Sequence, residues 1–245
     1  ADDKSAGRLV VASDMVWLEA PTDAALASVL GLPNAAADYG AAKALLVDVV
    51  GVRTALTDQE LLDCLHAMAD AEGLLYDGTS RDVAPTLRAI LASDPQQLLA
   101  LSARAYQLLA QQLLGSDARG VASELDAAFF EHRLLCVPLV ADGERLSVTF
   151  CASPEIYWSA KSDEDADIAA AAGLHGLAGA YPASLRAFFV ETLHVPLAPE
   201  PSASRLLEAL HELAEAPPSD RSKALAAAFA RKLAACDLAG LDVVD

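Results

Sequence analysis

One short pattern occurs twice in this chain, and this repetition constrains the fold more than any other feature. The stretch ASDMVW (12–17) returns as ASPEIYW (152–158), and each copy ends on one of the two tryptophans. The distance between them is about 140 residues. Elements that recur in the same order at a fixed distance are typical of a duplicated structural unit.

Two further stretches follow each tryptophan in the same order. YGAAKALLVDVVGV (39–52) returns as YPASLRAFFVETLHVP (181–196), and QELLDCLHAMADA (59–71) returns as SRLLEALHELAEA (204–216). The last alignment places His211 opposite His66, beside apolar leucines, and predicts a packing role for both histidines. The repetition therefore predicts two tandem units, at 1–132 and 133–245, that stack on a shared core.

Local signals predict that helices form most of each unit. Thr57 and Glu60 have the spacing of a capping box, which begins a helix predicted to end at Gly73. Another helix is predicted at 35–50, with its end at Gly51. Apolar periodicity places the remaining helices of this part from about 83, at 95–114 and at 118–132.

A single hairpin is predicted between the two sets of helices. Apolar residues at 134–140 and 145–151 flank Asp142-Gly143, a dipeptide that favours a two-residue turn. Pro138 lacks an N–H group, so the first strand should lie at a sheet edge. The expected fold class is therefore α+β and predominantly α-helical, in two tandem repeat units that each join a small strand or hairpin element to several helices.

The charge of the chain excludes some partners. Its net charge of −18 and its 17 scattered basic residues argue against direct binding of nucleic acid or of an acidic membrane surface. Alanine makes up roughly a fifth of the chain, and it favours helices with little side-chain volume. Protein partners or clients are expected instead.

The cysteines and the apolar runs bear on the compartment. Cys64, Cys136, Cys151 and Cys236 show no C-x-x-C spacing, which favours reduced, buried thiols in an intracellular protein of the cytoplasm or nucleus. Cys136 and Cys151 would lie on adjoining arms of the hairpin. No signal peptide is recognisable, and no apolar run reaches the ~18 residues of a membrane span.

An acidic stretch has part of the spacing of a calcium-binding loop. The acidic residues at the first three ligand positions are Asp163, Asp165 and Asp167. Ile168 replaces the required glycine, however, and Leu174 replaces the final glutamate. Ser162 and Asp165 instead predict the capping box of a helix.

No pattern in the chain identifies a catalytic, cofactor-binding or metal-binding residue. The five histidines lack the helical spacing of a zinc site, and no G-x-S-x-G motif is present. The glycines of GLHGLAG (173–179) follow a helical pattern and lack the lysine of a phosphate-binding loop. No catalytic residue, metal or cofactor is therefore predicted.

Large aromatic residues mark the repeated stretches and are the candidate anchors of a protein interface. They are Trp17, Tyr157, Trp158, Tyr181, Phe188 and Phe189. Tryptophan and tyrosine are typical of interface anchors and equally of cores. The repeat matches Leu45-Leu46 to Phe188-Phe189, which keeps apolar character while identity varies. That behaviour favours core packing over an interface.

The order of these elements resembles a known family. An apolar hairpin, then SPEIYW, an acidic loop and YPASLRAFFVETLHVPLAPEPSASRLLEALHELA resemble the long region of the plant protein NO VEIN and its sacsin-like relatives. The similarity covers most of 8–240 and is clearest at 134–214. In that family such units follow an Hsp90-like ATPase domain, whose residues have no match here. The resemblance implies a piece of a chaperone-like scaffold, linked to ATP only through an upstream domain that this chain lacks.

The sequence thus predicts a non-enzymatic protein-interaction or scaffold segment of a large NO VEIN/sacsin-like protein. Two alternatives stay open. One is a free-standing helical adaptor unrelated to chaperones. The other is a small hydrolase or transferase whose site is assembled by folding, which a concave pocket with converging polar groups would support.

Overall fold

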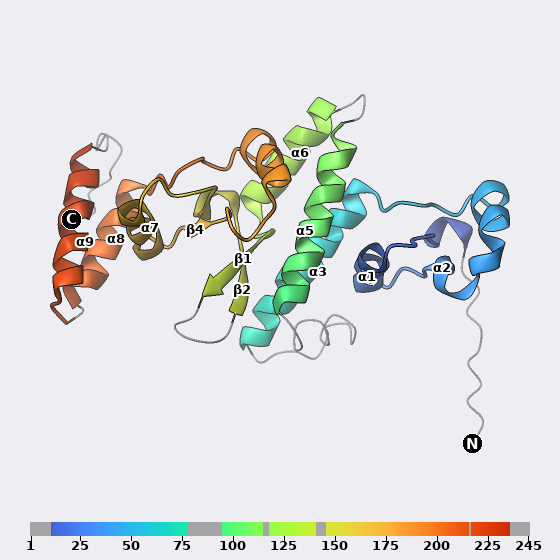
Figure 1. Ribbon diagram of the computed structural model, residues 1–245, viewed down its shortest axis with the longest axis horizontal. Helices are drawn as coiled ribbons and strands as arrows, with labels where there is room; N and C mark the ends of the chain where they lie inside the picture. The colour runs from blue at the N-terminus through green and yellow to red at the C-terminus, as the bar shows by residue number, and fades with distance from the viewer. Residues whose placement is uncertain (1–10, 78–94, 115–117, 141–145, 216, 236–245) are drawn as a thin grey trace, which may run out of the picture. The chain divides into compact units, whose positions relative to one another are not determined.

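The computed structural model describes residues 11–77, 95–114, 118–140, 146–215 and 217–235 (Figure 1). Over these ranges the chain is mostly helical and contains two small two-stranded sheets. The predicted class, α+β and predominantly α-helical, is confirmed. Contacts between Cα atoms divide the chain into two compact units, one made of Ala1–Arg119 with Pro138–Phe150 and the other of Gly120–Val137 with Cys151–Asp245. The boundary predicted after residue 132 stays a prediction.

The described elements up to the hairpin are three short 3₁₀ or π turns, five α-helices and two strands. They are η1 (Ala12–Asp14), α1 (Pro21–Val29), α2 (Ala35–Asp38), η2 (Gly40–Ala42), η3 (Ala44–Val49), α3 (Asp58–Asp77), α5 (Pro95–Gln112), α6 (Ala118–Glu131), β1 (Leu135–Val140) and β2 (Leu146–Cys151). The strands β1 and β2 form one sheet, as the sequence predicts. The predicted turn at 142–143 and the predicted helix from about residue 83 lie outside the described residues.

The later elements follow the hairpin. They are η4 (Ser153–Glu155), β3 (Ile156–Tyr157), α7 (Asp163–Ala171), β4 (His175–Gly176), η5 (Ala183–Leu185), η6 (Phe188–Thr192), α8 (Ala203–Glu215) and α9 (Asp220–Ala235). We call residues 11–77 the first segment and residues 152–215 the second segment.

Three helices form the core of the first unit. The helices α1, α3 and α5 pack against one another, and α3 and α5 run alongside each other in Figure 1. Their largest fully buried side chains are Leu26, Leu61, Leu65, Met68, Leu98, Leu101, Tyr106 and Leu109. Burial of an apolar side chain of this size contributes about 1.5–3 kcal/mol to folding, so this cluster is the main source of stability in the unit.

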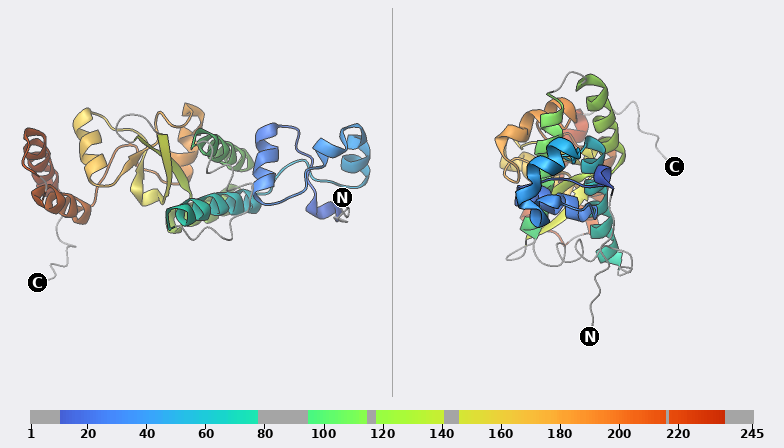
Figure 2. Two further views of the ribbon diagram at one scale, coloured as in Figure 1. Left: turned by 90° about the horizontal axis from the view of Figure 1, so that it is seen from below. Right: turned by 90° about the vertical axis from the view of Figure 1, so that its right-hand side faces the viewer.

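A similar group of helices lies in the second unit. The helix α9 packs against both α7 and α8, and α8 and α9 lie side by side in the left view of Figure 2. One buried cluster joins all three helices: Ile168, Leu206, Ala209, Ala228 and Phe229.

An ion pair joins the first helix of each group to the last. Asp23 of α1 accepts two hydrogen bonds from Arg104 of α5, at 2.5 and 2.8 Å. Asp165 of α7 accepts one from Lys232 of α9, at 3.0 Å. Both acids lie in the first turn of their helix, where a negative charge is also favoured by the helix dipole.

The two tryptophans have corresponding backbone partners. The N–H of Trp17 donates to the carbonyl of Arg53, at 2.7 Å, and the N–H of Trp158 donates to the carbonyl of Pro196, at 2.8 Å. In each segment the acceptor is the second residue after a left-handed position, Gly51 (φ 84°) or His194 (φ 50°). The backbone of each tryptophan is therefore paired with the chain that leaves a π-helix.

The helices α1 and α7 also end in the same way. Gly31 and Gly173 have φ angles of 68° and 66°, a conformation that glycine adopts without the steric cost of a Cβ atom. In both places the N–H of the next residue bonds to the carbonyl five residues earlier, at 2.9 and 2.8 Å. After this turn the chain runs back beside the stretch that leads into the tryptophan.

The prediction of one helix over 35–50 is wrong. The chain breaks at Tyr39, whose φ and ψ of −126° and 31° are not helical, and continues as the 3₁₀ turn η2 and the π-helix η3. The second segment likewise contains η5 and the π-helix η6. Alanine-rich spacing predicts helical φ and ψ, but it does not distinguish the wider π turn from an α turn.

The capping box at the start of α3 is confirmed. Glu60 accepts a hydrogen bond from the backbone N–H of Thr57, at 2.8 Å, and its own N–H donates to the Thr57 hydroxyl, at 3.2 Å. The predicted end at Gly73 is wrong, because α3 runs on to Asp77. One glycine within a helix costs about 1 kcal/mol, too little to end a helix by itself.

Glu60 makes the stability of the first unit sensitive to acid. Arg53 donates to both of its oxygens, at 2.8 and 2.7 Å, and this pairing lowers the pKa of Glu60 to about 2. A depressed pKa contributes stability that is complete above the ordinary value of about 4.5 and is lost as pH falls toward 2. Because both side chains are partly exposed, we expect Glu60→Gln to cost about 1–2 kcal/mol at pH 7.

Urea unfolding checks this expectation. In a Trp158→Phe background, Trp17 fluorescence reports the first unit alone. The difference in unfolding free energy between the parent and Glu60→Gln should shrink between pH 5 and pH 2.5. Asp70→Asn, at an exposed position of α3 in the same unit, is the matched control. An equal difference at both pH values would contradict the assignment.

Candidate functional site

Four of the six predicted aromatic residues form one buried cluster in the second unit. Phe189 is fully buried, and its ring centre lies 6.1 Å from that of Trp158, 5.4 Å from that of Tyr181 and 5.6 Å from that of Phe188. Tyr157, also buried, belongs to a neighbouring cluster with Ala169 and Leu174. These residues lie in the interior of the second unit and present little surface to a partner.

Trp17 is buried in the first unit, in a cluster whose other members are not aromatic. It packs with Ala35 and Val52, against the partly buried Leu46. Leu46 is the residue that the repeat matches to Phe189, so both tryptophans contact corresponding residues. The indole N–H of Trp17 donates to Glu19 at 3.2 Å.

The first segment exposes a group of apolar side chains that the sequence comparison did not identify. We call it the Leu45 face, and it consists of Tyr39, Leu45, Val49 and Val50, which are 54%, 56%, 74% and 47% exposed. Leu45 and Val49 lie on the π-helix η3, and Val50 is the residue that caps its C-terminal end. Contiguous exposed apolar residues are typical of interaction sites. The repeated sequence pattern could not reveal them. It shows that these residues are apolar, but it does not show whether another element packs over them.

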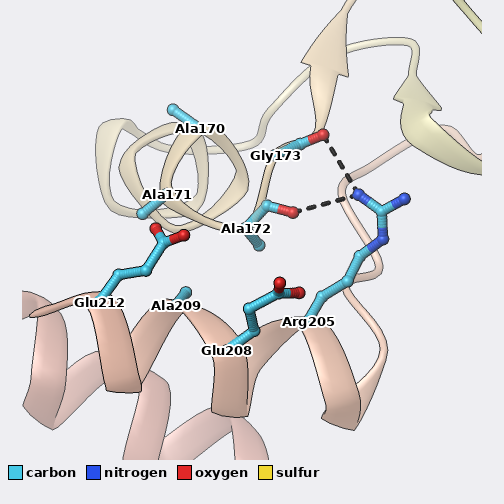
Figure 3. A pocket seen from close by; sticks show the side chains of 8 residues that line it. All are labelled: Ala170, Ala171, Ala172, Gly173, Arg205, Glu208, Ala209 and Glu212. Atoms are coloured by element: carbon cyan, nitrogen blue, oxygen red, sulfur yellow. Dashed lines mark hydrogen bonds between the residues drawn. The ribbon is translucent and has the colours of Figure 1, made fainter.

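A cleft of about 460 Å³ lies between the end of α7 and α8 (Figure 3). Alanine and glycine make up five of its eight lining residues, and its polar lining side chains are Arg205, Glu208 and Glu212. No serine, cysteine or histidine lines it, so it offers no residue of the usual nucleophile and base types. Glu208 and Glu212 lie one helical turn apart and point from α8 toward the end of α7.

Arg205 is engaged in holding this cleft together. Its guanidinium donates to the carbonyls of Ala172 and Gly173, both at 3.3 Å, and lies 3.6 Å from Glu155. Arg205 thereby satisfies carbonyls that the end of α7 leaves without helical partners. The geometry favours a structural role for Arg205 over the binding of an anion.

The other predicted polar features have local roles. Ser162 accepts a hydrogen bond from the N–H of Asp165, at 3.1 Å, so the predicted cap of α7 is confirmed. The packing role predicted for His211 is wrong, because its side chain is 78% exposed and lies 3.6 Å from Glu215; alignment beside leucines does not determine which helix face a residue occupies. Within the described ranges no group of three or more potential ligands is placed to hold a metal.

Cys64, Cys136 and Cys151 are buried. Burial raises the pKa of the Cys64 thiol to about 12, and its sulfur lies 3.0 Å from the carbonyl of Leu26. A thiol with so high a pKa is a poor nucleophile at neutral pH. Cys236 lies outside the described residues.

Among the helices of the described residues, none combines the length and apolar character needed to cross a bilayer. Comparisons of the chain with protein-family models, with curated proteins and with solved structures find no match.

Proposed function

We propose that this chain is a non-enzymatic protein-interaction and scaffold segment, built from two copies of one module, within a large protein of the NO VEIN/sacsin-like kind. The matched tryptophan hydrogen bonds, the paired left-handed positions and the paired acids of α1 and α7 support duplication. The exposed Leu45 face is the observation that carries the interaction role. The lining of the α7–α8 cleft, without a serine, cysteine or histidine, disfavours a hydrolase or transferase there.

Site-specific photo-crosslinking tests the interaction role. A photoreactive amino acid at Val49, in the full-length protein in its own cells, should give discrete adducts with other polypeptide chains or segments. The matched control is the same amino acid at Gln97, an exposed position of α5, which should give none. Equal labelling from both positions, or no adduct from Val49, would reject the interaction role of the Leu45 face in cells.

The chaperone connection has a separate test. The full-length transcript should encode an Hsp90-like nucleotide-binding domain upstream of these residues. A transcript without one would favour a free-standing adaptor.

A further inference from the structure

Corresponding positions of the two segments differ sharply in exposure. The matched pairs, with exposed fractions, are Tyr39 (54%) and Tyr181 (6%), Leu45 (56%) and Phe188 (4%), and Val50 (47%) and Leu193 (1%). The local backbone is the same in both places: the N–H of Val50 bonds to Leu45, and the N–H of Leu193 to Phe188. The difference in exposure must therefore come from what packs on the second segment.

The element that covers the second segment is α6 with the start of β1. The ring of Phe129 on α6 meets the ring of Phe188 edge to face, with centres 6.3 Å apart and an interplanar angle of 87°. The hydroxyl of Tyr181 donates to the backbone carbonyl of Cys136 on β1. The ring of Phe129 therefore covers Phe188, and the carbonyl of Cys136 accepts the hydrogen bond of the Tyr181 hydroxyl.

Two polar contacts complete this cover. Asp126 of α6 lies 3.1 Å from the ring nitrogen Nδ1 of His194, and Ser153 donates to the carbonyl of Phe129 at 3.1 Å. At the position of His194 the first segment has Gly51, which has no side chain to meet an acid. At the position of Ser153 it has Ser13, whose hydroxyl donates to Asp14 at 3.0 Å. An element covering the Leu45 face would therefore need the aromatic and strand contacts and not the acid.

We propose that the Leu45 face docks an amphipathic helix followed by an extended segment, equivalent to α6 and the start of β1 and supplied by a neighbouring module of the same kind. This inference rests on the proposed function. The helix places an aromatic ring against Leu45, and the extended segment offers a backbone carbonyl to the Tyr39 hydroxyl. Docking in this way covers exposed apolar surface, which is the main favourable term in protein association.

The probe for this proposal is residues 120–137 fused to a soluble carrier and titrated against the full 245-residue chain. We expect saturable binding. Leu45→Asp in the chain and Phe129→Ala in the probe should each weaken it by about tenfold or more, as expected for a central apolar anchor. Asp126→Ala in the probe should change it less than about twofold, because Gly51 offers that acid no partner. Leu45 is exposed, so its substitution should leave the melting temperature unchanged.

Three outcomes would overturn the proposal. The first is the absence of binding. The second is binding that depends on Asp126 and is insensitive to Leu45→Asp, since the probe would then be displacing α6 from the second segment. The third is a dimer in sedimentation velocity that Leu45→Asp converts to monomer, since a second copy of the chain would then be the occupant. Crosslinks from Val49 without probe binding would reject this inference alone, and probe binding without crosslinks in cells would reject the proposed function alone.

Discussion

Replacing Phe189 by alanine is expected to lower the unfolding free energy of the second unit by about 3–5 kcal/mol. The ring is fully buried and contacts the rings of Trp158, Tyr181 and Phe188. Its removal leaves a cavity among three other rings from separate parts of the chain, so the site can collapse only in part. Urea unfolding followed by Trp158 fluorescence, in a Trp17→Phe background, measures the change.

Phe189→Leu is the matched control, because the first segment has Leu46 at this position. Leucine keeps most of the apolar volume, and we expect a cost below about 1.5 kcal/mol. If alanine and leucine have equal effects, the ring contacts contribute little and the cluster is less tightly packed than its geometry indicates.

Trp158→Ala is expected to cost about 3–5 kcal/mol, and Trp17→Ala should destabilise the first unit in the same direction. Both side chains are buried, and each backbone N–H bonds to the chain that leaves a π-helix. Far-UV circular dichroism during urea unfolding is the measurement, since each variant loses the fluorophore of its own unit.

Trp158→Ala also distinguishes a core role of this residue from an interface role. An unchanged midpoint for Trp158→Ala, together with loss of a partner, would make that residue an interface anchor. Conservative Trp158→Phe should recover most of the stability if the role is packing, because an aromatic ring still fills the site next to Phe189.

Local patterns predicted several elements well, because their causes are local. The caps at Thr57 and Ser162 satisfy N–H groups within four residues along the chain. The strands β1 and β2 agree with the predicted ranges to within a residue or two, since apolar runs beside a turn dipeptide leave few alternatives. The six aromatic residues are buried for the same reason that their pattern favours core packing: large rings gain most from leaving water.

The errors arose where distant parts of the chain compete with local preference. The break at Tyr39 and the π-helix η3 lie between Trp17 and Arg53, whose backbones pair although they are far apart in the sequence. Local spacing does not report such a pairing. The exposed position of His211 depends on how α8 is rotated against its neighbours, which alignment with His66 does not specify.

The sequence by itself determined which residues are apolar, where most helices begin and that one pattern occurs twice. Only the tertiary structure decided that Phe188 is covered and Leu45 is not, although both are apolar residues at matched positions. The physical reason is that a side chain is buried only when another surface packs against it. A side chain's own chemistry favours leaving water, but whether it does so depends on the ring that another element, here Phe129 of α6, brings against it.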